Sequence, residues 1–340
     1  MKLRSDPLYS EISTHYPCHD TMRSALTYHC RSSIRGTGAR RTVLARPASS
    51  IASTSTKNAL NYCVQLVSQK DRERYLCNLH APEAARPGLF AIHAFNIETA
   101  HIRTATKQET AALGRFSWWR SALGKSLDGT PPEHPVALAL AHVHTRYGLT
   151  PRYLTQLLDA READMLVKQP RDRDELQLYS ERTAGAMLLL GLECAGVKPG
   201  DCEAAEHAAS QAGIALGIAT LLRGTAAHAA QGCTYLPAEV TTRHGVKLSA
   251  MLRGEVTPPV CDAMAEVADE AVAHLLAARS LRDDVPKAAR SVLLPATLAD
   301  HILRNLQRHG YSPFAAGAQA PAGGPSLQMS LLWQRWMASY

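Results

Sequence analysis

The sequence lacks features that define several protein classes. No run of apolar residues approaches the roughly eighteen that a bilayer-spanning helix needs, so we expect no such helix. Alternating β-branched residues are scarce, whereas Ala and Leu dominate, and this predicts an all-α fold. None of the eight cysteines forms a C-x-x-C pair, which favours free thiols in a reducing compartment over structural zinc.

Positive charge is unevenly distributed along the chain. The formal net charge is +7 over 340 residues, and residues 1–57, with nine basic and three acidic residues, contribute +6 of it. The rest of the chain is therefore nearly neutral. Because many basic side chains are needed to bind a phosphate backbone, we expect no nucleic-acid partner.

Acidic residues are absent from Met22 to Gln69, a stretch that carries seven basic residues and many Ser, Thr and Ala. Such a composition is typical of a mitochondrial transit peptide, and the alternative is a disordered basic tail. Three acids interrupt the pattern within residues 1–21, which makes Met22 a candidate alternative start. We interpret residues 1–57 as a transit peptide or disordered segment.

Pro and Gly divide the remaining chain into helical segments. We expect one helical domain over 58–316, a flexible Gly-, Pro- and Ala-rich linker over 317–325, and an amphipathic aromatic helix over 326–340. The expected helices cover 58–79, 84–105, 108–127, 134–147, 150–168, 172–196, 201–230, 236–253 (broken), 260–282, 287–309 (broken) and 326–339.

Small residues recur on one face of the segment 201–230. Gly213 and Gly217 are four residues apart and lie on the same face as Ala209. A face without bulky side chains predicts that another helix packs closely against it.

Five stretches resemble, in order, the squalene/phytoene synthase family. They are YLCNLHAPEAARPGLFAIHAF (75–95), FSWWRSALGKSLDGTPPEHPVALAL (116–140), LLDAREADML (157–166), DELQLYSERTAG (174–185), and the stretch 213–237 that ends in Tyr-Leu-Pro. The resemblance covers roughly residues 62–310. It implies a single-domain helical bundle around a central cavity.

Active members of that family condense prenyl diphosphates. The leaving diphosphate is stabilised by magnesium ions, which take carboxylate oxygens as ligands. Carried over by resemblance, the acid positions of the two metal-binding helices fall here on Ala100, Thr104, Thr220, Gly224 and His228. None is a carboxylate, so we expect no catalytic residues, no metal site and no cofactor.

Other polar residues of the family's cavity remain in this chain. The candidates for lining the cavity are Asn96, Glu98, His101, Asp159, Asp164, Arg223 and Tyr235. The alternative is hydrogen bonding and charge pairing between helices, for instance of Asp159 with an arginine of a facing helix. Glu98 and His101 have the spacing of a di-iron carboxylate motif, but no matching second step is found.

The departures from the family pattern are themselves informative. Residues 95–98 (Phe-Asn-Ile-Glu) and the acid-free second motif resemble a catalytically degenerate branch, which assists the assembly of respiratory complex I. This implies a mitochondrial protein at the matrix face of the inner membrane. Its partners would be complex I subunits or other assembly factors, the membrane surface, and a lipid-like ligand in the cavity. The alternatives are a magnesium-dependent prenyl-diphosphate condensing enzyme and a peripheral lipid-binding protein.

The last segment combines apolar and aromatic residues. Trp333, Trp336 and Tyr340 lie beside Leu331 and Leu332, with Arg335 between them. Trp and Tyr next to an apolar face suit a membrane interface or a partner surface. A last helix packed on the core explains the pattern equally well.

Overall fold

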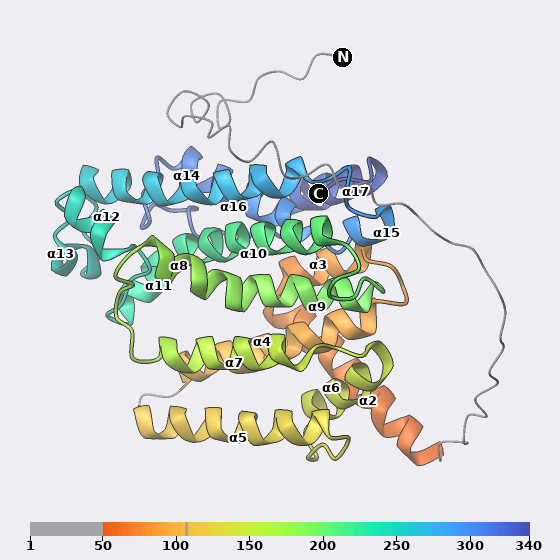
Figure 1. The fold of residues 1–340 in the computed structure, drawn as a ribbon. Helices are drawn as coiled ribbons and strands as arrows, with labels where there is room; N and C mark the ends of the chain where they lie inside the picture. Colours follow the sequence, from red (N-terminus) through yellow and green to blue (C-terminus); the bar gives the residue numbers. More distant parts are fainter. Residues whose placement is uncertain (1–49, 106–107) are drawn as a thin grey trace. The chain divides into compact units, whose positions relative to one another are not determined.

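The computed structural model describes residues 50–105 and 108–340, so the expected transit peptide lies largely outside the described residues. Every regular element in these two ranges is a helix, which confirms the all-α prediction (Figure 1). The first helix of the described residues begins at Ser50, earlier than the expected start at 58.

The helices follow the predicted order, and proline at the first or second position opens α6, α7, α14, α16 and α17. Their bounds are α2 (Ser50–Lys70), α3 (Arg72–His80), α4 (Arg86–Ala105), α5 (Glu109–Leu127), α6 (Pro135–Tyr147), α7 (Pro151–Asp164), α8 (Arg173–Ser180), η3 (Glu181–Gly185), α9 (Ala186–Cys194), α10 (Glu203–Arg223), α11 (Thr225–Ala230), α12 (Ala238–Arg243), α13 (Leu248–Leu252), α14 (Pro258–Ser280), α15 (Lys287–Arg290), α16 (Pro295–Arg308) and α17 (Pro325–Trp336).

Helix α10 forms the centre of one half of the domain. It packs against α8, η3, α9, α14 and α16, and every residue from Ala212 to Ala219 is buried. A Cβ added to Gly213 would lie 2.2 Å from the Cα of Gly185, and one added to Gly217 would lie 2.5 Å from the Cβ of Ser180. The predicted close helix approach is therefore confirmed.

A π-helical turn, η3, interrupts the helix expected over 172–196. It joins α8 to α9 at the point where Gly185 meets Gly213 of α10. A π turn inserts one extra residue per turn and shifts the register of the helix. The turn thus places a glycine opposite a glycine, where the two backbones approach most closely.

The other half of the domain is built on α2, α4, α5 and α6. Helix α4 lies against α2 and α6, and α5 runs beside α6 and α7 (Figure 1). Phe95 of α4 and Phe116 of α5 are fully buried, and the Phe95 ring meets the Trp119 ring edge to face at a centroid distance of 5.3 Å. This packing fixes the rotation of α4 about its own axis, and it therefore decides which α4 side chains point away from this core.

The segment 317–325 joins α16 to α17 through specific contacts. Asn305 of α16 donates from Nδ2 to the carbonyl oxygen of Gly317 at 2.8 Å, and the backbone N–H of Ala322 donates to Glu73 of α3. Helix α17 then packs against α16 and α3. In the described part of the chain, no helix combines the length and apolar character needed to cross a membrane. The six cysteines described are free thiols, as predicted.

Candidate functional site

The centre of the candidate site is a buried ion pair between α4 and α7. Arg103 donates from Nη1 to the Asp164 carboxylate at 2.5 Å, and their side chains are only 18% and 7% exposed. The same guanidinium group also donates to the backbone carbonyls of Asp164, at 2.9 Å, and Val167, at 3.0 Å. Several charge-assisted hydrogen bonds thus stabilise a cation that is largely removed from water.

Tyr235, from the loop after α11, completes this group. Its hydroxyl donates to Asp164 Oδ2 at 2.5 Å and accepts from Arg103 Nη1 at 3.0 Å. Burial, followed by the proximity of Tyr179 and Asp164, raises the pKa of Tyr235 far above its ordinary value. The phenol therefore stays neutral and serves as a hydrogen-bond donor.

A second arginine extends the network toward α4 and α8. Arg161 of α7 donates to the Tyr179 hydroxyl at 2.8 Å and to Asn96 Oδ1 at 3.0 Å. The Tyr179 and Tyr235 rings stack, with centroids 5.6 Å apart and an interplanar angle of 27°. The network, defined here as Asn96, Arg103, Arg161, Asp164, Tyr179 and Tyr235, joins four segments of the chain.

The positions that the resemblance assigns to the family's metal ligands offer no anionic group to this network. The hydroxyl of Thr104 donates to the His101 carbonyl at 3.1 Å. That of Thr220 donates to the Leu216 carbonyl at 2.7 Å, so both hydroxyls form hydrogen bonds within their own helices. Ala100 of α4 is half-buried, and Gly224 ends α10.

His228 of α11 packs edge-on against the Tyr235 ring at 4.7 Å and lies over Gly224, where an added Cβ would come within 2.7 Å of the imidazole. Burial, and then the nearby Arg103 cation, lowers the pKa of His228 to about 4. The imidazole is therefore neutral near pH 7. Across residues 50–105 and 108–340, no three side chains of His, Cys, Asp or Glu form a group that could hold a metal ion.

The structure brings together Asn96, Asp164 and Tyr235 among the predicted cavity residues. Glu98 instead faces α2. There, burial is the main cause that raises the pKa of Cys63 to about 12, and the nearby negative charge of Glu98 raises it further. His101 is exposed. These two residues therefore point to different surroundings, and they do not form a common polar site.

Asp159 lies on the outer side of α7. It pairs with Arg120 of the facing helix α5 at 2.6 Å, and both side chains are about half exposed, at 49% and 47%. Glu162 binds the same guanidinium group. The interpretation of Asp159 as a charge partner between helices is therefore confirmed.

Arg223 lies at the end of α10 and binds a buried acid. Its Nη1 and Nη2 donate to the two carboxylate oxygens of Glu73 at 2.5 and 2.9 Å. Glu73 also accepts from the backbone of Ala322, so one carboxylate connects α10, α3 and the segment 317–325. Arg223 thus binds a carboxylate of its own chain in the bidentate geometry that guanidinium offers to any planar anion.

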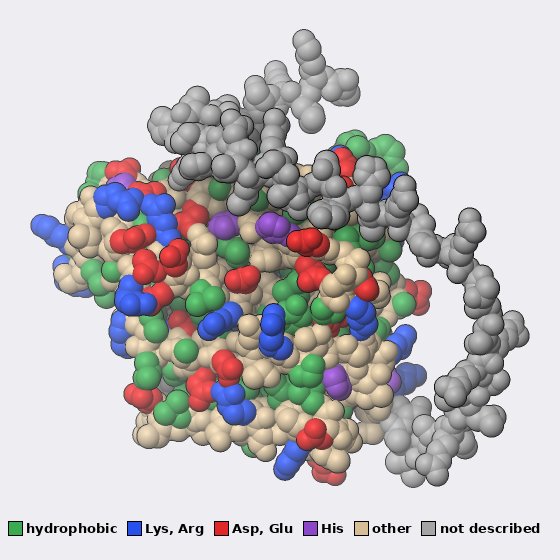
Figure 2. Space-filling model, in the orientation of Figure 1, with side chains coloured by type: hydrophobic (Ala, Val, Ile, Leu, Met, Phe, Trp, Pro, Cys, Tyr) green, Lys and Arg blue, Asp and Glu red, His purple; other side chains and the backbone are tan. Residues whose placement is uncertain are grey.

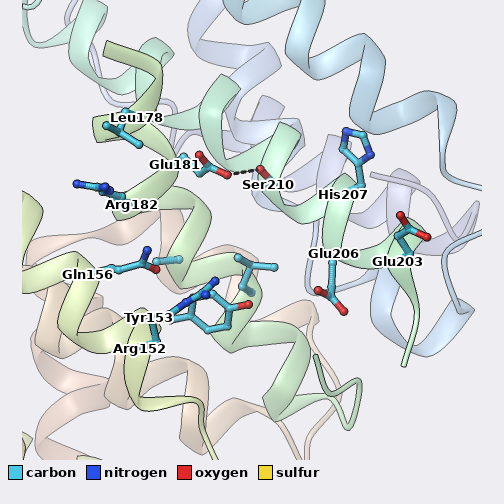
Figure 3. Close-up of a pocket in the computed structure, with 12 residues that line it drawn as sticks. Arg152, Tyr153, Gln156, Leu178, Glu181, Arg182, Glu203, Glu206, His207 and Ser210 are labelled. Atoms are coloured by element: carbon cyan, nitrogen blue, oxygen red, sulfur yellow. Dashed lines mark hydrogen bonds between the residues drawn. The ribbon is translucent and has the colours of Figure 1, made fainter. Parts of the chain in front are cut away.

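Two cavities lie on this part of the domain, and network residues line the smaller one. One, of about 160 Å³, is walled by Asp164, Tyr179 and Tyr235 and by the apolar side chains of Val167, Leu176 and Leu178. The other, of about 460 Å³, lies between α7, η3 and α10 (Figure 3). Arg152 and Arg182 face Glu206 and His207 across it, and Glu181 on its wall accepts from Ser210 at 3.0 Å (Figure 3).

Sequence reasoning missed the residues that dominate the site, namely Glu73, Arg103, Arg161 and Tyr179. Spacing offered a partial signal. Arg161 lies three residues before Asp164, which places both on one face of α7. The partners of Glu73, 150 residues from Arg223 in sequence, could not be inferred from local spacing.

The aromatic residues at the C-terminal end separate into two groups. Trp333 and Trp336 are 59% and 74% exposed, whereas Tyr340 is 1% exposed and donates its hydroxyl to the Ala278 carbonyl at 2.9 Å. Of the three membrane or partner candidates, only the two tryptophans are therefore available to a partner.

Comparison with known proteins gives a consistent result. The squalene/phytoene synthase family pattern matches residues 67–331. NADH dehydrogenase (ubiquinone) complex I, assembly factor 6 of Bos taurus is 33% identical over 312 residues, covering 90% of this chain and 92% of the relative. The Homo sapiens protein of the same name is 34% identical over 280 residues, covering 82% and 83%.

A solved structure supports the fold. The crystal structure of a dehydrosqualene synthase with a bound ligand superposes with a TM-score of 0.72 at 19% identity, over 85% of this chain and all of that one. At this identity, the match concerns the fold alone. By sequence and fold, this chain belongs to the squalene/phytoene synthase family, and within it the chain is similar to the members named complex I assembly factor 6.

Proposed function

We propose that this chain is a non-catalytic assembly factor for mitochondrial respiratory complex I, and that it acts early at the inner membrane. The observation that carries the proposal is the similarity to relatives of that name, which reaches 92% of the length of the Bos taurus protein. A match over nearly the whole of both chains favours a shared role over a shared module.

The site is consistent with a role that needs no metal chemistry. Magnesium-bound diphosphate requires several carboxylates facing one cavity. The five aligned positions carry Ala, Thr, Gly and His, and the nearby Asp164 already binds Arg103 and Tyr235. An arginine guanidinium group at this point would also repel magnesium ions. These features support a fold that keeps the family's shape for binding a partner.

The location and partners form the finer part of the proposal. The acid-free, Ser-rich stretch from Met22 to Gln69 favours import into mitochondria. We place the protein at the matrix face of the inner membrane, where it would bind complex I subunits, in particular a membrane-embedded core subunit, or other assembly factors. A lipid-like chain in the apolar part of the 160 Å³ cavity is the candidate small ligand.

Gene deletion tests this function. In cells that lack the chain, native gels of mitochondrial membranes should show loss of mature complex I, with the other respiratory complexes retained. Re-expression of the full chain should restore complex I. Normal complex I in the deletion line would refute the proposal. Fluorescent tagging of chains that start at Met1 or at Met22 would test import separately.

A further inference from the structure

Helix α17 is apolar on two opposite sides. A helix that is hydrophobic all round is normally covered all round, because its apolar surface is excluded from water. In α17, the domain covers one side only. The other side carries more strongly exposed apolar residues than any other described helix.

The inner side of α17 is firmly held. Leu327 and Leu331 are fully buried against α16 and α3, and His301 of α16 hydrogen-bonds Ser330 at 2.9 Å. Beyond the helix, Arg279 donates to the carbonyl of Tyr340 at 3.1 Å and Arg290 donates to that of Ala338 at 3.1 Å. The helix is therefore a fixed part of the domain.

The outer face of α17, as we define it, consists of five side chains at helical spacing. Met329, Leu332, Trp333, Trp336 and Met337 follow the steps i, i+3, i+4, i+7 and i+8, which place them on one stripe. Their exposed fractions are 66%, 53%, 59%, 74% and 50%. In the space-filling view, hydrophobic side chains gather at the upper right edge, where Figure 1 shows α17 (Figure 2).

The chain segment that carries this face has charged side chains of one sign only. Residues 301–340 contain no Asp or Glu, and they carry Arg304, Arg308 and Arg335. Arg304 pairs with Asp300, whereas Arg308 and Arg335 are exposed. An acid-free basic segment beside exposed Trp side chains matches the surface of an anionic bilayer, where Trp sits at headgroup depth and Arg meets the lipid charge.

The family match also sets this face apart. The squalene/phytoene synthase pattern ends at residue 331, whereas Trp333 and Trp336 follow it. The two tryptophans are therefore not part of the pattern that the family's fold shares.

We propose that the outer face of α17 docks the protein on a membrane that contains anionic lipid, by shallow insertion of Trp333, Trp336 and their Met and Leu neighbours. The inference rests on the proposed function only for the identity of the membrane that the protein binds in the cell. The domain would lie with α17 in the interface plane, and no helix would cross the bilayer.

Vesicle binding by the purified full chain tests this docking. The probe is a set of vesicles of phosphatidylcholine, with or without cardiolipin, that carry bromine on the acyl chains to quench tryptophan fluorescence. All four tryptophans lie beyond residue 117, so quenching does not report on the basic N-terminal segment. The variants are W333Q/W336Q and a matched control, L166Q/V256Q, which replaces side chains that are 65% and 46% exposed elsewhere.

The wild-type chain and L166Q/V256Q should float with cardiolipin vesicles and be quenched. W333Q/W336Q should bind these vesicles about tenfold more weakly and lose the added quenching. Because both tryptophans are exposed, its circular dichroism and melting temperature should equal those of the wild type. Equal quenching of wild type and W333Q/W336Q would overturn the proposal. The proposal would also be overturned if the wild-type chain did not bind vesicles, or if analytical ultracentrifugation showed that it dimerises through this face. None of these results depends on complex I levels, so each can fail independently of the proposed function.

Discussion

Arg103 of α4 and Asp164 of α7 form a buried ion pair, with 2.5 Å between Nη1 and Oδ2. The pair lies beside Tyr235, and the Tyr235 ring in turn contacts His228 of α11. A cation and its counter-ion, both supplied by the chain, therefore lie in the interior between α4 and α7.

Removal of Arg103 should destabilise the domain strongly. Arg103→Gln leaves the Asp164 carboxylate buried without its cation, which costs about 3–5 kcal/mol in comparable buried pairs. Urea unfolding followed by circular dichroism would measure this loss. Arg120→Gln is the matched control, because its pair with Asp159 is half exposed. That change should cost no more than about 1 kcal/mol. Equal losses for both variants would contradict the importance assigned to the buried pair.

His228 should make folding sensitive to mild acid. In the folded chain its pKa is lowered to about 4, from an ordinary value of 6.5. Above pH 6.5 the imidazole is neutral in both states, and its contribution to stability is complete. Between pH 6.5 and 4 only the unfolded chain takes up the proton. The free energy of unfolding should therefore fall, by at most about 1.4 kcal/mol per pH unit for this group.

Urea titrations at a series of pH values would measure that slope. His228→Gln should make it shallower, because the group that takes up a proton only in the unfolded chain is then absent. A slope unchanged by His228→Gln would show that this imidazole does not contribute to the acid sensitivity.

Glu73 should control how firmly the segment 317–325 is held. Glu73→Ala removes the acceptor for both Arg223 and the Ala322 N–H, and it leaves the Arg223 cation without its partner. We expect a loss of about 3 kcal/mol and faster amide hydrogen exchange over 317–325. Glu73→Gln keeps one acceptor oxygen and should show a smaller change in exchange. Unchanged exchange in Glu73→Ala would mean that other contacts hold this segment.

Gly213 should tolerate no side chain. A Cβ at this position would lie 2.2 Å from the Cα of Gly185, so Gly213→Ala must separate α10 from η3. We expect a loss of at least about 3 kcal/mol, or failure to fold. Gly114→Ala in α5 is the control, since a Cβ there meets nothing within 4 Å. Higher helix propensity should make that variant more stable by about 0.5–1 kcal/mol. Thermal unfolding of both variants would distinguish the cost of the steric clash at Gly213 from the gain in helix propensity at Gly114.

The sequence predicted the parts of the fold that depend on local pattern. Apolar periodicity and proline positions gave the order and type of the helices, and the spacing of Gly213 and Gly217 indicated a close helix contact. The boundary at Gly224, where α10 gives way to α11, was not predicted, because a single glycine is compatible with either a continuous or a broken helix.

The site was only partly predictable. The sequence shows directly that Ala100, Thr104, Thr220, Gly224 and His228 are not carboxylates. Their assignment to the family's metal-ligand positions stays a prediction. The partners of the remaining polar residues could not be predicted, because Arg103 meets Asp164 across 61 residues and Arg223 meets Glu73 across 150. Such pairs depend on the relative placement of whole helices. For the same reason, the sequence could not distinguish the buried Tyr340 from the exposed Trp333 and Trp336.

We infer that this fold has kept the family's shape without its metal-dependent chemistry. Incubation of the purified chain with farnesyl or geranylgeranyl diphosphate and magnesium tests it most directly, with an active dehydrosqualene synthase assayed alongside. Product hydrocarbon and released diphosphate are measured. We expect the amounts of hydrocarbon and of released diphosphate to equal those measured without protein. Magnesium-dependent release of diphosphate by the wild-type chain, lost in Asp164→Asn, would contradict it.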